Sequence, residues 1–145
     1  MLNNTTVTIP LNIIDLHDGF HPLLQIQLFN QVFNLVLDTG ASRTAFDHQL
    51  LLMANEHAPI IASEKLSTGL GTNTMASATA KVKDIAIGEL LIPELEVAVL
   101  DLSTINIAYA ELGHPEVLGV LGSDVLMEYN AVIDYGKMEL ILHSA

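Results

Sequence analysis

The chain has 145 residues, half of them hydrophobic and only 15% charged, so it is long enough for one globular domain and too apolar for a disordered protein. Seventeen Asp and Glu against five Lys and Arg give a formal net charge of -12, which repels phosphate backbones and argues against a nucleic-acid partner. The absence of cysteine excludes disulfides, thiolate catalysis and zinc sites built on sulfur.

The hydropathy pattern bears on the location of the protein. The N-terminus has no basic region followed by an apolar core, and no apolar run reaches the length of a membrane span. We therefore expect a soluble, cytoplasmic protein without a membrane partner.

Three strands joined by short turns are expected at the start of the chain. Residues 6–13 alternate polar and apolar side chains, and Pro10 puts this strand at a sheet edge. Residues 23–29 alternate again, and a third strand begins after Asn30-Gln31 and leads into Asp38. Together these segments predict an antiparallel meander.

The middle of the chain changes from a helical pattern to a hairpin pattern. Residues 48–55 are mostly straight-chain residues with Asp47 at the N-cap position, which predicts a short helix. Residues 60–83 become small and polar and predict a long hairpin with a glycine-rich tip. The tip lacks the sequence of a phosphate-binding loop.

Two further strands are expected at residues 82–88 and 95–101, joined around Pro93. This unit and residues 25–38 both run strand, turn, strand, aspartate, which suggests a weak internal duplication. After it, residues 103–112 predict a short helix capped by Ser103.

The strand that ends at residue 37 runs directly into Asp38-Thr39-Gly40. Apolar, β-favouring residues precede the aspartate, and Gly40 permits a backbone conformation that a side chain would oppose. Asp38 is therefore held in a defined direction. Taken alone, the tripeptide could also simply end a strand, because Asp, Thr and Gly are ordinary turn residues.

The other aspartates that follow apolar strands lack this context. Asp101 could in principle pair with Asp38 within one chain, but neither it nor Asp124 or Asp134 is followed by Thr and Gly. We interpret all three as structural or surface carboxylates.

The last third of the chain supplies a second motif. Val120-Leu121-Gly122 puts apolar residues directly before a glycine, and a short helical stretch follows to Tyr129. Residues 131–142 then predict a hairpin that turns at Gly136-Lys137.

In combination these motifs resemble the retropepsin family of aspartic proteases, and most closely its small bacterial members. The resemblance rests on Asp38-Thr39-Gly40-Ala41-Ser42, on Val120-Leu121-Gly122 downstream, and on Ile133-Asp134-Tyr135. It implies a mainly β fold: a closed retropepsin-like acid-protease barrel formed as a single domain by residues 1–145, with one to three short helices and one lobe per chain.

The family's site residues transfer to matching positions of this sequence. The resemblance makes Asp38 the catalytic carboxylate, with Thr39 bracing the two active-site loops across a dimer and Gly40 letting backbone groups approach. Substrate-binding residues would be Ala41 and Ser42, together with Gly69, Leu70, Gly71 and Thr72 of a flap, and structural support would come from Val120, Leu121 and Gly122. Compared with the retroviral enzymes of the family, this chain has extra sequence at its start and at residues 102–115, and its flap lacks an aromatic residue.

One Asp-Thr-Gly per chain predicts an endopeptidase that is complete only as a homodimer, because the reaction needs two adjoining carboxylates. The expected partners are a second copy and an extended peptide or protein substrate. No cofactor is expected, and six scattered histidines without a metal-binding spacing predict no metal site. The alternative is a non-catalytic peptide-binding or dimerisation module that retains the protease fold.

Overall fold

The computed structural model describes residues 5–67 and 75–144. Its strands are β1 (Thr5–Pro10), β2 (Asn12–Asp15), β3 (Phe20–Leu28), β4 (Gln31–Leu37), β5 (Ala45–Asp47), β6 (Ile60–Ser67), β7 (Met75–Ile87), β8 (Leu90–Leu100), β9 (Gly119–Leu121), β10 (Val132–Asp134) and β11 (Glu139–Ser144). The helices of the described residues are α1 (His48–Ala54), α2 (Ser103–Glu111) and α3 (Ser123–Glu128). The predicted mainly β fold with short helices is confirmed.

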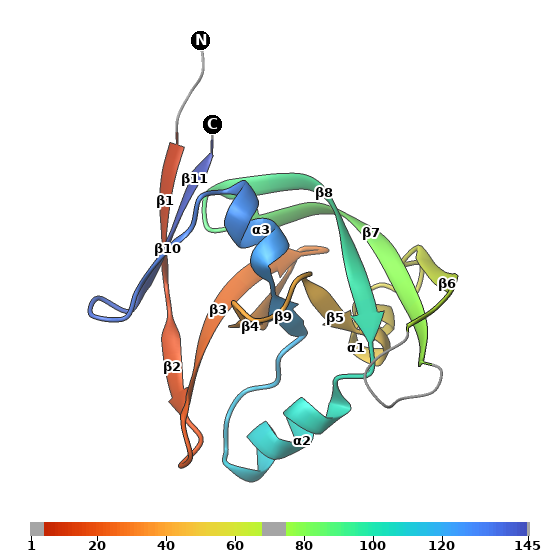
Figure 1. Cartoon of the computed structure of the whole chain (residues 1–145), viewed down its shortest axis with the longest axis horizontal. Helices are drawn as coiled ribbons and strands as arrows, with labels where there is room; N and C mark the ends of the chain where they lie inside the picture. The colour runs from red at the N-terminus through yellow and green to blue at the C-terminus, as the bar shows by residue number, and fades with distance from the viewer. Residues whose placement is uncertain (1–4, 68–74, 145) are drawn as a thin grey trace.

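The described strands form a small sheet and a large one. The small sheet has the order β1-β11-β10, and the large sheet has the order β2-β3-β4-β9-β5-β8-β7-β6. A pairing of Gln27 in β3 with Ala86 in β7 joins distant parts of the large sheet, so that β3, β4, β9, β5, β8 and β7 close into a barrel. Figure 1 shows the small sheet along the left side of the barrel and α2 at its lower end.

The same arrangement, a hairpin beside a third strand that is parallel to one of its strands, occurs twice in the large sheet. The β3–β4 hairpin lies beside β9, with β4 and β9 parallel, and the β7–β8 hairpin lies beside β5, with β8 and β5 parallel. The two central strands β5 and β9 are antiparallel. This arrangement agrees with the internal duplication that the sequence suggested.

Apolar side chains, which alternate with outward-facing polar ones along the strands, fill the interior of the barrel. In β3, Leu24, Ile26 and Leu28 are each 1% exposed, whereas Gln25 and Gln27 between them face outward. Most buried residues of the described strands, together with Leu51 of α1 and Val125 of α3, form one large hydrophobic cluster, and Ile14, Leu23 and Val36 belong to a second, smaller one. The barrel core therefore has a covered end at each of these two helices.

The first predicted strand divides in two at Leu11. Residues before it form β1, which pairs with β11, and residues after it form β2, which pairs with β3. The predicted meander therefore consists of β2, β3 and β4, and β1 lies in the other sheet. Pro10 lies in an edge strand as predicted.

Two local predictions in the second half were wrong. The turn between β7 and β8 is at Gly88-Glu89, where Gly88 has φ +59, and Pro93 lies inside β8. Pro93 fits there because it has no partner in the register with β7, in which Asp84 has φ +57, and because β5 pairs with β8 only from Ala98 to Leu100. The N-cap of α2 is Leu102, and Ser103 is its first residue.

Candidate active site

Asp38 lies directly after β4, in a tight turn. Its backbone N–H donates to the carbonyl oxygen of Leu121 at 3.0 Å, and its own carbonyl oxygen accepts from the N–H of Ala41 at 3.2 Å. Its carboxylate Oδ1 accepts from the N–H of Gly40 at 3.0 Å. Asp38 is half-buried, whereas Thr39 and Gly40 are exposed, so the turn presents the carboxylate at the surface of the chain in a fixed direction.

The segment predicted to support Asp38 lies alongside it. Val36 and Leu37 of β4 pair in parallel with Val120 and Leu121 of β9. A Cβ atom on Gly122 would lie 2.6 Å from the carbonyl carbon of Arg43 and 2.9 Å from the carbonyl oxygen of Ala41. Only glycine permits this approach, and it brings the end of β9 against the backbone of the Asp38 turn.

A buried threonine, which the sequence did not single out, connects the two segments. Thr44 is fully buried, and its hydroxyl donates to Oδ1 of Asp124 at 2.8 Å and accepts from the N–H of Gly122 at 3.1 Å. The same oxygen of Asp124 accepts from the backbone N–H of Thr44 at 2.9 Å. Asp124 is therefore a structural carboxylate that holds the end of the Asp38 loop.

Asp38 lies on the wall of a pocket of about 290 Å³. The pocket is formed by the ends of β3, β4 and β9, by α2 and by the turn after β10, and its described lining residues are Phe20, His21, Pro22, Val36, Leu37, Asp38, Thr39, Ile105, Tyr109, Val120 and Tyr135. Among these residues Asp38 is the only carboxylate, and the other walls are mainly apolar or aromatic.

A hydrogen bond between distant elements closes one side of this pocket. Nδ1 of His21 lies 2.6 Å from the hydroxyl oxygen of Tyr109, which is 2% exposed. Burial raises the pKa of Tyr109 above its ordinary value, so the hydroxyl remains protonated. The two residues are 88 positions apart, and no local motif in the sequence marked either of them.

The other residues considered in the sequence analysis form three groups: those directly after the Asp38 turn, the flap residues, and the aspartates interpreted as structural. Ala41 is half-buried and Ser42 exposed, both directly after the Asp38 turn. The flap residues Gly69, Leu70, Gly71 and Thr72 lie outside the described residues. Oδ1 of Asp101 accepts from the N–H of Ser103 at 3.0 Å, and Oδ1 of Asp134 accepts from the N–H of Lys137 at 2.9 Å, so each is bonded within its own turn.

The sequence model of the aspartyl protease family, described as "Aspartyl protease", matches residues 24–125. The chain belongs to the aspartyl protease family. The match spans β3 to α3 and thus includes both the Asp38 turn and Gly122, and it confirms the family that the motifs suggested.

Two solved structures match this aspartyl protease family member over most of its length. A retropepsin-like aspartic protease from Rickettsia conorii shares its fold, with a TM-score of 0.56 and 20% identity, over 97% of this chain and 90% of that one. A retroviral protease-like domain of Ddi1 from Leishmania major matches with a TM-score of 0.48 and 10% identity, over 85% of this chain and 93% of that one. Among curated proteins, none matches the chain.

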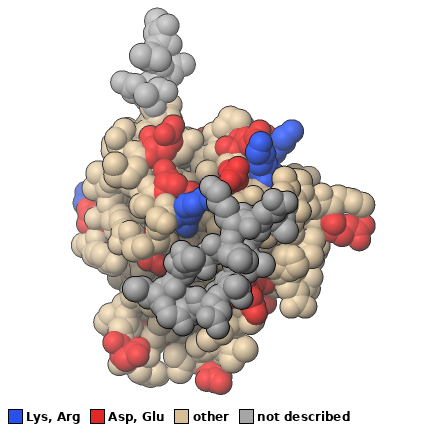
Figure 2. All heavy atoms as spheres, turned by 45° about the vertical axis from the view of Figure 1, so that its right-hand side comes forward, with Lys and Arg blue, Asp and Glu red and all other residues tan. Residues whose placement is uncertain are grey.

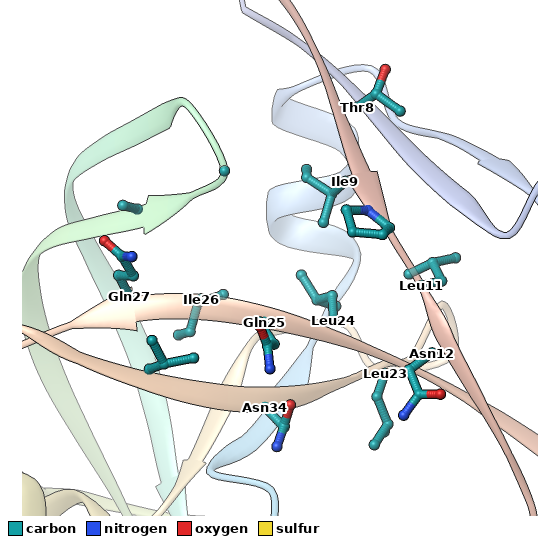
Figure 3. A pocket seen from close by; sticks show the side chains of 14 residues that line it. Thr8, Ile9, Leu11, Asn12, Leu23, Leu24, Gln25, Ile26, Gln27 and Asn34 are labelled. Atoms are coloured by element: carbon teal, nitrogen blue, oxygen red, sulfur yellow. The ribbon is translucent and has the colours of Figure 1, made fainter.

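A second hollow of the protease fold lies away from Asp38 and has a volume of about 440 Å³. Figure 3 shows it between the β1–β2 segment and the β3–β4 hairpin, with the side chains of Asn12, Gln25, Gln27 and Asn34 among those that line it. None of its described lining residues has a side chain that titrates, so these residues offer no general acid or base. Of these two pockets, the smaller one is the one whose described lining includes a carboxylate.

Acidic residues outnumber basic ones in this family member, seventeen to five. Figure 2 shows one face on which acidic side chains outnumber basic ones and lie in separate groups. Among the residues whose side chains the structure describes, no three His, Cys, Asp or Glu residues are grouped so as to hold a metal ion. No helix of the described part of the chain is long and apolar enough to cross a membrane.

Proposed function

We propose that the protein is an aspartic endopeptidase in which a water molecule is activated by two Asp38 carboxylates, one from each chain of a homodimer. The observation that carries the proposal is the setting of Asp38, which is fixed at the end of β4 and is the only carboxylate among the described residues of its pocket. Membership of the aspartyl protease family supports it.

The chemistry requires a second carboxylate. Hydrolysis without a covalent intermediate needs one group to take a proton from water while another gives a proton to the carbonyl oxygen. Two adjoining carboxylates that share a proton can do both, because like charges so close cannot both ionise; aspartic proteases are the standard example of this behaviour. Asp101 and Asp124 are engaged in their own turn and in the Thr44 contact, respectively.

A two-fold axis beside the Asp38 turn would supply the second carboxylate of the pair, because it brings Asp38 of a second copy next to Asp38 of the first. Thr39 and Gly40 are exposed next to Asp38, which leaves this turn accessible to a partner chain. We propose that an extended peptide then contacts Ala41 and Ser42, and that the segment containing Gly69, Leu70, Gly71 and Thr72 covers it as a flap.

Substitution of the carboxylate tests catalysis. Wild-type protein is expected to cleave a mixed peptide library somewhere between about pH 4 and 7, the range in which shared-proton carboxylate pairs operate. Asp38→Asn has nearly the same shape and should abolish cleavage. Asp101→Asn is the matched control, since Asp101 ends β8 as Asp38 ends β4, and it should leave cleavage intact. Cleavage by folded Asp38→Asn protein would disprove the mechanism.

A mixing experiment tests whether the site is shared between chains. Adding an excess of Asp38→Asn protein to a fixed amount of wild-type protein, with time for subunit exchange, should suppress cleavage, because mixed dimers hold a single Asp38. Unchanged activity, with mixed dimers demonstrated by sedimentation or mass, would show that each chain acts alone. A wild-type dimer that binds peptides without cleaving any would instead support the binding-module alternative.

A further inference from the structure

The larger hollow, of about 440 Å³, is an opening between two strand segments that diverge. Figure 3 shows β1 and β3 separating from the point where Asn12 pairs with Leu23. The opening closes again at its far end, because Gln27 of β3 pairs with Ala86 of β7. On the third side a Cβ atom on Gly88 would lie 3.2 Å from the nearest side-chain carbon of β1, so the β7–β8 turn packs against β1. The hollow is therefore bounded on three sides.

The β3 side of the opening carries backbone groups without a strand partner. Phe29 and Asn30 both have positive φ, as the type I′ turn of a two-residue hairpin requires. In such a hairpin the flanking residues Leu28 and Gln31 are hydrogen-bonded to each other, and bonded and non-bonded pairs alternate from there. The N–H and C=O groups of Gln25 therefore point away from β4. Its neighbours two positions away pair with β2 and β7 on that edge, but no described strand pairs with Gln25 there.

The β1 side of the opening has such groups as well. β1 is an edge strand of the small sheet, and beyond its end the N–H of Leu11 donates to the carbonyl oxygen of Met138 at 2.8 Å, on the β11 side. Because backbone groups point alternately to the two sides of a strand, those of Thr8 and the C=O of Pro10 point to the other edge, on which Asn12 pairs with β3. Two facing rows of donors and acceptors thus border the hollow.

Between these two edges the hollow has an apolar floor and an uncharged rim. Ile9, Leu24 and Ile26 line it from the barrel core and are 3%, 1% and 1% exposed, whereas Asn12 and Gln27 are exposed. A volume of about 440 Å³ lies within the range of about 300–1,000 Å³ that is typical of small-ligand pockets, which combine apolar walls with a few placed polar groups. No described lining residue carries a charge, so a charged ligand would be desolvated without a counter-charge from them.

We propose that this hollow binds a small, uncharged ligand that carries amide groups on an apolar body. Amide N–H and C=O groups are complementary to the free backbone groups of Gln25 and Thr8, and the apolar body would cover the floor. Leu23 and Gln27 are about 13 Å apart along β3, at about 3.3 Å per residue, and strand pairing closes both ends, so a long extended chain cannot lie there. The hollow shares no described lining residue with the pocket of Asp38, and the inference does not depend on the proposed peptidase activity.

Backbone amide resonances of ¹⁵N-labelled protein test the inference, with N-acetyl-leucine-N-methylamide as the probe. Saturable shifts of the Gln25 and Thr8 resonances are expected, with a Kd of about 1 mM for a ligand of this size. N-acetyl-leucine, which has a charged carboxylate, and N-acetylglycine-N-methylamide, which lacks the apolar body, should each bind about tenfold more weakly or less. Gln27→Phe places a ring at the hollow and should weaken binding of the probe by about tenfold, whereas Gln49→Phe, on an exposed position of α1 outside the lining, should not change it.

The absence of saturable shifts at Gln25 and Thr8 with the probe at about ten times the expected Kd would overturn the inference, because the hollow would then hold only water. Equal affinities for the charged and uncharged probes would also overturn it. So would shifts of the same resonances when the protein is concentrated without probe, since a second copy would then fill the hollow. The probe comparison uses unaltered protein, so it decides the matter even if Gln27→Phe does not fold. None of these measurements involves cleavage, so the result is independent of whether Asp38 is catalytic.

Discussion

The Thr44 hydroxyl provides a quantitative test of how the Asp38 loop is held. Thr44→Val keeps the shape of the side chain and removes the hydroxyl, so the Asp124 carboxylate loses one donor and the Gly122 N–H loses its acceptor. A hydrogen bond to a charged group contributes about 1.5–3 kcal/mol, and an orphaned buried donor costs about 1–3 kcal/mol. Allowing about 1 kcal/mol for the added apolar methyl, we expect the free energy of unfolding to fall by about 1.5–5 kcal/mol.

Urea unfolding followed by circular dichroism measures this change, and two controls isolate the hydroxyl. Thr44→Ser keeps both hydrogen bonds and should lose only about 0.5–1.5 kcal/mol for one methyl group. Ser123→Ala removes a long contact of 3.4 Å from its hydroxyl to the carbonyl oxygen of Ser42, and it should change stability by less than about 0.5 kcal/mol. The reasoning is refuted if Thr44→Val is as stable as Thr44→Ser, because the hydroxyl contacts would then contribute nothing.

Three further predictions use the same unfolding assay. Gly122→Ala forces a Cβ to within 2.6 Å of backbone and should cost about 1–3 kcal/mol or more together with any peptidase activity, whereas Gly19→Ala meets open space and should be neutral. Asp47→Ala removes the acceptor of two backbone N–H groups, at the start of α1 and before α2, and should cost about 2–4 kcal/mol; a loss below about 1 kcal/mol would contradict this. Because burial raises the pKa of Tyr109 in the folded state, the unfolded state loses its proton first as pH rises, so stability should fall above about pH 10 and fall less steeply in Tyr109→Phe; equal slopes would contradict the assignment.

Features that depend on neighbouring residues could be predicted from the sequence. The N-cap at Asp47 is an example, since its carboxylate accepts from the N–H of Leu50 three residues later. The turn around Gly136-Lys137 is another, because a polar turn between two apolar runs marks a hairpin whatever the hairpin packs against. The Asp38 turn also belongs here, because its bond to the Gly40 N–H spans two residues.

Features that depend on pairing between distant segments could not be predicted from local patterns. The split at Leu11 arises because β1 finds its partner in β11 at the other end of the chain. The pocket beside Asp38 needs His21 and Tyr109, which meet only after the barrel closes and α2 docks on it. Thr44 gave no local signal either, because the donors and acceptors that it connects lie about 80 residues away and are brought near by the pairing of β5 with β9.

The repeated strand arrangement bears on why we propose one catalytic turn in each chain and not two. Both β4 and β8 end at an aspartate whose Oδ1 accepts from the N–H two residues later, at 3.0 Å in each case. Each following loop is also held by an aspartate from the opposite half, Asp124 for the loop after Asp38 and Asp47 for the loop after Asp101.

The two strand ends differ in the residues that come after the aspartate. After Asp38 the chain makes a tight turn whose Thr39 and Gly40 stay exposed, whereas after Asp101 it enters α2 at once. The side chain and backbone of Ser103 both lower the pKa of Asp101, so this carboxylate is stabilised in its ionised form and is poorly suited to share a proton. In the mechanism that we propose, the second carboxylate is therefore Asp38 of another chain and not Asp101 of the same chain.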